Sequence, residues 1–192
     1  MVQWQKDKEK KSTTLAVWGN NVGEGEADSN ARKERMKLVT NVIFLLNVTK
    51  VGDRTCAHTS ILVTVDIPEG ITSIGDYSFA YCKSLKDIKF STTVESIGQQ
   101  AFTGCESLVN INLLNTRINR IASKAFGDCK KLKSMKIPDA LEMSGFGRFV
   151  FQNCSELVPT KINVSDTGND VTGEVIAYLH KVRTRILGHW PH

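Results

Sequence analysis

The chain has 192 residues, 41% of them hydrophobic, and a formal net charge of +5 from 25 basic and 20 acidic side chains. This apolar content is enough to bury one modest core. The charges are interspersed along the chain, which does not indicate a nucleic-acid-binding surface. The apolar run at residues 42–46 is far too short to cross a bilayer, so the sequence predicts no membrane span.

The first 38 residues are polar and glycine-containing and show no apolar period. This composition predicts a disordered or loosely attached arm over residues 1–38. Met1 is followed by charged residues instead of an apolar stretch, so no secretory signal is visible. The compartment stays unknown, and the pattern favours an intracellular location over the cell surface only slightly.

A repeated pattern begins at Val39, in a degenerate first copy. Moving a later, clearer copy back by 23 residues matches its apolar positions and glycine with Val42, Phe44, Val48, Val51 and Gly52. Cys56 then falls where later copies have phenylalanine, so we expect it to lie outside the column of cysteines and to react faster. An end repeat often degenerates in this way because one of its faces meets solvent.

Clearer copies follow, each with leucine, two residues, an aliphatic residue, one residue and a second aliphatic residue. The last copy, at Leu157, is weaker because Thr160 replaces the first aliphatic. The alternation predicts a short strand with one buried face. Six short parallel strands in one continuous sheet are therefore expected to begin near residues 39, 62, 85, 108, 132 and 157, and antiparallel hairpins between them would contradict the repeat.

A second stretch in each copy has a small residue, phenylalanine, and then cysteine and leucine at three-residue intervals. This spacing predicts a short helical or 3-10 segment with one buried side. Stacked copies would align Phe79, Phe102, Phe126 and Phe151 as one column and Cys82, Cys105, Cys129 and Cys154 as another.

The cysteines could instead bind metal or carry redox chemistry, but their spacing argues against both. Successive cysteines from Cys82 to Cys154 are 23, 24 and 25 residues apart, whereas zinc ligands come in pairs two to four residues apart. A uniformly apolar column also contains nothing to lower a thiol pKa. We therefore predict structural cysteines, no metal site and no cofactor.

The pattern weakens toward the end of the chain. Residues 141–147 contain two extra residues, which predicts a bulge in that connection. Pro159 lies within the last expected strand, where a sheet edge tolerates proline. Residues 170–187 have apolar residues at helical spacing after a plausible N-cap at Asn169 or Asp170, which predicts a helix that covers the end of the stack.

The stretch IPEGITSIGDYSFAYCKSLKDIKF, residues 67–90, closely resembles the BspA-type, or Treponema pallidum-type, leucine-rich repeats. The resemblance implies a cysteine-containing solenoid with strands on one face. Together with the spacing above, it leads us to expect an α/β, mostly β, solenoid with short helical or 3-10 segments opposite the strands and a C-terminal capping helix. We expect an N-terminal arm at 1–38, the solenoid at 39–162 and a cap with tail at 163–192. Members of the family are commonly surface proteins or adhesins of bacteria and protists that bind other molecules.

The solvent face of the expected strands is the candidate site. One row contains Asp66, Lys89, Asn112, Lys136 and Lys161, and the row beside it contains Thr64, Asp87, Asn110, Ser134 and Pro159. A ladder of this kind is the usual binding surface of a solenoid. The lysines could equally serve only to keep the sheet soluble. Neither row contains the aromatic anchors that dominate many interfaces.

Three functions compete on this basis. A non-catalytic module or scaffold that binds another protein, one with an acidic surface, is favoured because no catalytic motif is present. A cell-surface adhesin of the same family is the alternative, and nucleic-acid binding is the distant third. The four histidines are expected to be solvated and not metal ligands. The sequence does not indicate the partner or the oligomeric state.

Overall fold

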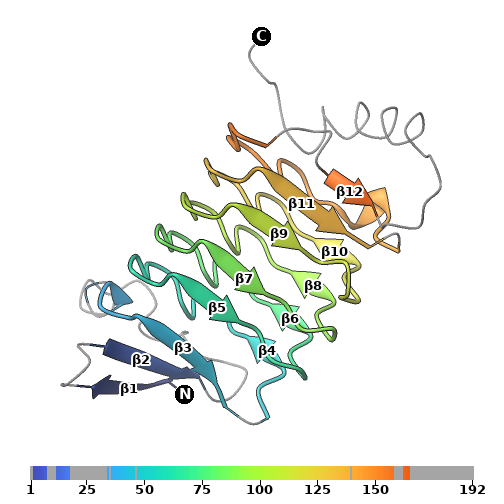
Figure 1. Cartoon of the computed structure of the whole chain (residues 1–192). Coiled ribbons are helices and arrows are strands. Elements are labelled where there is room, and N and C mark those ends of the chain that lie inside the picture. Colours follow the sequence, from blue (N-terminus) through green and yellow to red (C-terminus); the bar gives the residue numbers. More distant parts are fainter. Residues whose placement is uncertain are drawn as a thin grey trace.

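The computed structural model describes residues 2–7, 12–17, 34, 36–45, 47–138, 140–157 and 162–164. Within these ranges the chain coils into a stack of similar turns, with one strand of each turn on the same side (Figure 1). These front strands are β3 (Asn41–Phe44), β5 (Thr64–Asp66), β7 (Asp87–Lys89), β9 (Asn110–Asn112), β11 (Ser134–Ile137) and β12 (Ile162–Val164). The predicted mostly β solenoid is confirmed.

Every pairing between described front strands is parallel, because each turn returns the chain in the same direction. The expectation of one continuous sheet is wrong, since β5 pairs with β7 while β9, β11 and β12 form a separate ladder. Strands of three or four residues offer few pairing groups. A single bond from the Val109 N–H to the Lys86 carbonyl, at 3.4 Å, continues the stack where β7 and β9 lie side by side.

A second sheet runs along the stack and was not predicted. It contains the two-residue strands β4 (Lys50–Val51), β6 (Ser73–Ile74), β8 (Ser96–Ile97) and β10 (Arg120–Ile121), all parallel (Figure 1). The second residue of each strand is buried and packs into the core. Two residues are too few to show the alternation that identifies a strand in a sequence.

The segments that return the chain are turns, so the predicted helical or 3-10 segments are absent from residues 52–61, 75–84 and 98–107. Tyr77 and Tyr81 show the reason, because both have a left-handed backbone, with φ of 55° and 62°. Alternate amides bond to the next turn, as from Phe79 to Ala101, and within the turn, as from Ala80 to Tyr77. The 3-10 helix η1 (Met143–Gly145) lies outside these segments, in the connection that follows β11.

Phenylalanine rings form the predicted column through the core. Phe79, Phe102, Phe126 and Phe151 are stacked in order, with ring centroids 5.2, 5.3 and 5.9 Å apart. Each ring is almost completely buried. One turn therefore supplies the apolar surface that covers the next, as expected for a repeat that cannot bury its own edge.

The cysteine column is buried beside the rings, and none of the five cysteines forms a disulfide. Each thiol of Cys105, Cys129 and Cys154 donates to the carbonyl oxygen of the phenylalanine one turn earlier, at 3.3, 3.2 and 3.1 Å. These thiols are thus polar links between turns as well as apolar filling. Cys56 is also buried, and it takes the phenylalanine position of the first copy, outside the cysteine column as expected. Its faster reaction stays a prediction.

The N-terminal segment covers one end of the stack. Strand β1 (Val2–Asp7) pairs antiparallel with β2 (Ser12–Val17), which pairs parallel with β3. Leu15, Val17 and Met36 are buried in the core. The expectation of a loose arm is therefore wrong over residues 12–17, since the first repeat needs apolar cover at its open end. The domain boundaries at 38/39 and 162/163 stay a prediction.

The last front strand is shifted from its expected register. Ile162 pairs with Met135 and Asn163 with Lys136, two residues later than the repeat pattern predicts. A shift of two preserves which side chains face inward, so alternation could not detect it. Lys161, Pro159 and the expected helix at 170–187 lie outside the described residues.

We expect Phe102→Ala to lower the free energy of unfolding by about 3–5 kcal/mol, because this ring stacks on two neighbours. Phe149→Ala is the matched control, since its side chain is 40% exposed. Chemical denaturation followed by circular dichroism measures both. Equal losses in the free energy of unfolding for the two variants would contradict a core stabilised by the stacked rings.

Ser78→Ala should stabilise the protein. Ser78 is completely buried, and among the described residues its hydroxyl has no hydrogen-bond partner. The next two copies have Ala101 and Ala125 at this position. Removing an unsatisfied buried hydroxyl is worth about 1–3 kcal/mol, and thermal unfolding would measure the gain. A lower midpoint for Ser78→Ala would show that the hydroxyl is satisfied.

Stability should fall as the pH rises above about 8.5, where thiols of the unfolded chain ionise. Burial raises the pKa of Cys105 and Cys129 well above the usual range. The folded state then retains protons that the unfolded state loses, so each thiol costs about 1.4 kcal/mol per further pH unit until its folded pKa is reached. Urea titrations from pH 7 to 10 should show a shallower decline for Cys105→Ala/Cys129→Ala than for wild type. Identical slopes would contradict the shift.

Candidate partner-binding surfaces

The predicted site residues lie in two rows on the front strands. Within the paired strands, Thr64 is level with Asp87 and Asp66 with Lys89. In the same way Ser134 is level with Asn110 and Lys136 with Asn112. All are exposed except Ser134, which is half-buried, while the residue between the rows is buried in each strand. Paired strands lie about 4.8 Å apart, so side chains of neighbouring strands can contact one ligand together.

Hydrogen bonds orient the two asparagines of this surface. The Ser134 hydroxyl donates to Asn110 Oδ1 at 2.6 Å, and the Leu114 N–H donates to Asn112 Oδ1 at 3.2 Å. A backbone amide can only donate, which fixes the carbonyl end of Asn112. The remaining polar group of each side chain is then an NH₂ donor. The described residues give Lys89 and Lys136 no ion pair. Their positive charges are therefore available to a ligand, beside the exposed carboxylates of Asp66 and Asp87.

Lys161 was expected to extend the first row, but the register places Asn163 beside Lys136 instead. The side chain of Lys161 lies outside the described residues. The structure thus groups Asp66, Asp87, Lys89, Asn110, Asn112, Ser134 and Lys136 on one face, and their role in binding remains a prediction.

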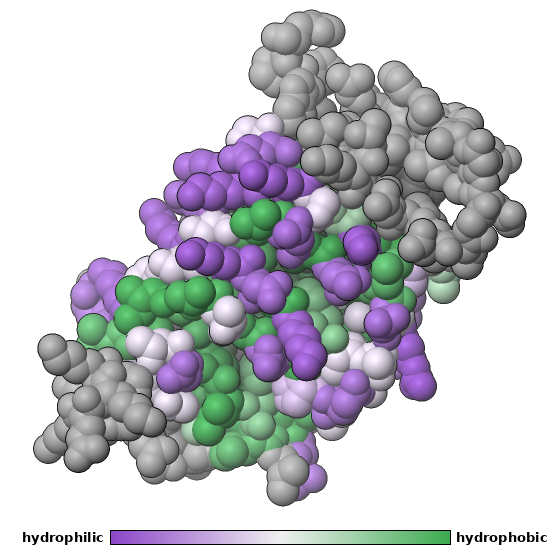
Figure 2. Space-filling view, in the orientation of Figure 1, coloured by the Kyte–Doolittle hydropathy of each residue, from purple (hydrophilic) through white to green (hydrophobic). Residues whose placement is uncertain are grey.

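An exposed apolar patch adjoins these rows and was not predicted from the sequence. Ile43, Leu45, Ile61 and Val63 are 40–44% exposed, and Leu38 is 61% exposed. Figure 2 shows hydrophobic surface over β3 and β5, beside the more polar surface of the later strands. The degenerate first copy contained the signal, because Ile43 stands where the next copy has Asp66.

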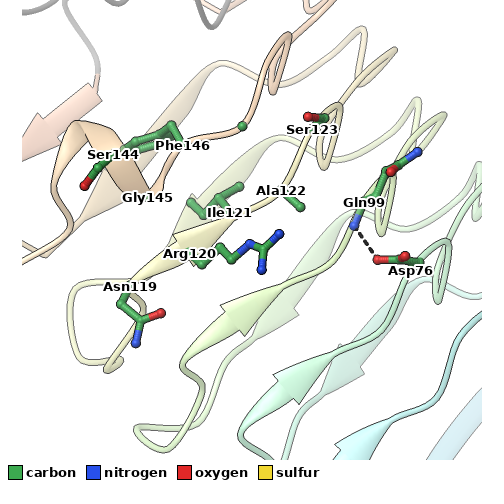
Figure 3. Close-up of a pocket in the computed structure, with 11 residues that line it drawn as sticks. Asp76, Gln99, Asn119, Arg120, Ile121, Ala122, Ser123, Ser144, Gly145 and Phe146 are labelled. Atoms are coloured by element: carbon green, nitrogen blue, oxygen red, sulfur yellow. Dashed lines mark hydrogen bonds between the residues drawn. The ribbon is translucent and has the colours of Figure 1, made fainter.

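A groove follows the second sheet (Figure 3). Its larger hollow, of about 530 Å³, is lined by Asp76, Gln99, Arg120 and the η1 segment, among others. A second hollow of about 410 Å³ shares Asp76, Arg120 and Ala122 with it, so the two lie side by side. The extra residues of the fourth copy end the sheet here, where Phe146 forms a single parallel bridge with Ile121. The predicted irregularity at 141–147 is thus a short helix and bridge.

One wall of the groove depends on pairs of acidic residues and glycines. Asp53 Oδ1 accepts from the Asp76 N–H at 3.0 Å, and Asp76 Oδ1 accepts from the Gln99 N–H at 2.7 Å. A Cβ on Gly98 would lie 2.5 Å from Asp76 Oδ1, which explains the glycine. In the next copy Gln99 takes the place of the aspartate. Ala122, one turn further on, then takes the place of the glycine.

Few titratable groups show special chemistry. Hydrogen bonds from Thr92, chiefly from its backbone N–H, lower the pKa of the exposed Glu69. Across the described part of the chain, no three His, Cys, Asp or Glu residues are placed to hold a metal ion. The same residues include no helix long and apolar enough to cross a membrane.

Two solved structures share this fold. A leucine rich cell surface protein from Faecalibacterium prausnitzii A2-165 is 20% identical with a TM-score of 0.58, and the similarity covers 100% of this chain but 42% of that one. The leucine rich repeat protein of T. pallidum is 21% identical with a TM-score of 0.58, covering 93% of this chain and 92% of that one. At these identities the likeness concerns the fold alone. No curated protein matches.

The family model that matches the chain is the BspA type leucine rich repeat region, in six copies over residues 35–179. The match includes the degenerate first copy and the irregular fourth one. It covers most of the 192 residues. The chain therefore belongs to the BspA-type leucine-rich repeat family.

Proposed function

We propose that this protein is a non-catalytic interaction module that binds another protein on its front strands. Repeat proteins of this family are typically non-enzymatic and commonly serve in protein interaction or at surfaces. The observation that carries the proposal is the continuity of two unlike surfaces. An apolar patch over β3 and β5 adjoins the polar rows that continue to β11 (Figure 2).

The two surfaces would contribute differently to binding. Burial of Ile43, Ile61 and Val63 would supply affinity, since apolar area removed from water is worth about 25 cal/mol per Å². Lys89 and Lys136 would attract acidic groups and raise the association rate more than the affinity. The amide NH₂ groups of Asn110 and Asn112 would donate to acceptors between the two lysines. The partner should therefore present an apolar segment flanked by carboxylates.

A cell-surface recognition role is the second candidate. The related protein from Faecalibacterium prausnitzii is described as a cell surface protein. An adhesin would use the same strand face, because the repeat leaves that face open in either setting. The two roles differ in where the partner is found and not in how it is bound.

The test begins with a partner recovered by affinity pull-down and identified by mass spectrometry. Lys89→Glu/Lys136→Glu should weaken its binding sharply, and the loss should be larger at low salt, where charge attraction is least screened. Folding should survive, since exposed substitutions usually change stability by about 0.5 kcal/mol or less. Titration calorimetry at two ionic strengths measures the effect.

Two further variants make the result specific. Lys131→Glu/Arg148→Glu changes the net charge equally at exposed positions outside the front strands and should retain binding. Ile61→Ser/Val63→Ser should weaken binding at both ionic strengths by similar factors, because apolar burial is not screened by salt. Wild-type affinity in both the lysine and the apolar variants would show that the partner binds another surface of the protein.

A further inference from the structure

The groove beside β6, β8 and β10 is a second surface, separate from the front strands. Its two hollows are lined by residues from successive turns and join at Asp76, Arg120 and Ala122. The two hollows thus follow one another along the stack, and neither is a closed cavity. Such a shape suits a chain lying lengthwise better than a small compact ligand, most of whose surface a pocket would enclose.

Charge in the groove is balanced, and one of its two cations is paired with an anion. Four charged residues line it, and Lys50 lies 3.7 Å from Asp53. Asp76 and Arg120 form no ion pair with any described residue. In Figure 3 the Arg120 side chain points toward the side of the groove where Asp76 and Gln99 lie. One anion and one cation are therefore left to attract a ligand that has both charges.

The two charged groups present defined contacts. Asp76 Oδ1 is occupied by the Gln99 N–H, which leaves Oδ2 for a ligand donor. The Arg120 guanidinium is planar and can bind a carboxylate through two parallel hydrogen bonds. Arg120 also lies in one row with two serines, since it is level with Ser96, which is level with Ser73. Hydroxyls of this kind can donate to or accept from a peptide backbone.

We propose that this groove binds an extended peptide segment with one acidic and one basic side chain. Arg120 contacts the carboxylate of the peptide, and Asp76 contacts its ammonium group. In an extended peptide, side chains two residues apart lie on one face about 7 Å from each other, and those four apart about 13 Å. The peptide runs along the stack, so its charges meet residues of different turns.

The test uses fluorescein-labelled heptapeptides of threonine and glycine, titrated by fluorescence polarisation at low salt. Four probes contain Glu and Lys two apart, Glu and Lys four apart, Glu alone, or Lys alone. One of the two dipolar peptides should bind tightest. Arg120→Gln should reduce the affinity of this dipolar peptide about two- to fivefold, to that of the peptide with Lys alone. Asp76→Asn should reduce it by a similar factor, to the affinity of the peptide with Glu alone.

The controls separate this groove from the front strands. Asp76→Asn retains the oxygen that accepts the Gln99 N–H, so the wall should stay intact. Arg117→Gln and Asp87→Asn make the same changes at exposed positions that do not line the groove and should leave peptide binding unchanged. Lys89→Glu/Lys136→Glu should also leave peptide binding in the groove unchanged. The outcome of the peptide test is therefore independent of the proposed function of the front strands. Equal affinity for all four peptides, or a dipolar preference that survives Arg120→Gln and Asp76→Asn, would overturn the proposal.

Discussion

Each turn of this chain has too little apolar surface to fold alone, so the structure depends on the contact between one turn and the next. The stacked rings from Phe79 to Phe151, 5.2–5.9 Å apart, are the largest fully buried side chains in that contact. The thiol of Cys105 adds a polar link, because it donates to the Phe79 carbonyl oxygen in the preceding turn. Repetition of the same two side chains keeps every interface alike, and this is why the period is so regular.

The same contact explains the backbone of the return segments. Bonds between turns require alternate amides to point along the stack, as from Tyr77 to Gln99 and from Phe79 to Ala101. An α-helix would direct all of them along its own axis. Left-handed residues such as Tyr81 redirect the chain, at a cost that a bulky side chain normally avoids. The interfaces between turns offset this strain.

Some of this could be predicted from the sequence, and some could not. The phenylalanine column was predictable because an interior position repeated every 23–25 residues has the same surroundings each time. The register of Ile162 was not, since a two-residue shift leaves alternation unchanged. The place of Gly98 beside Asp76 was also hidden, because the two residues are 22 apart in sequence and meet only across turns. Of the candidate site, the polar rows were predicted, whereas the apolar patch and the groove were missed.

The apolar patch and the groove could not be predicted for the same physical reason. The repeat constrains inward positions, where a change would disturb both neighbouring turns, and leaves outward positions free to vary. Ile43 replaces a polar residue in one outward row, and Arg120 replaces a serine in another. Neither change affects the core, so neither is required for folding. Departures of this kind are where a binding function can differ between solenoids with the same interior, and both candidate surfaces are built around one of them.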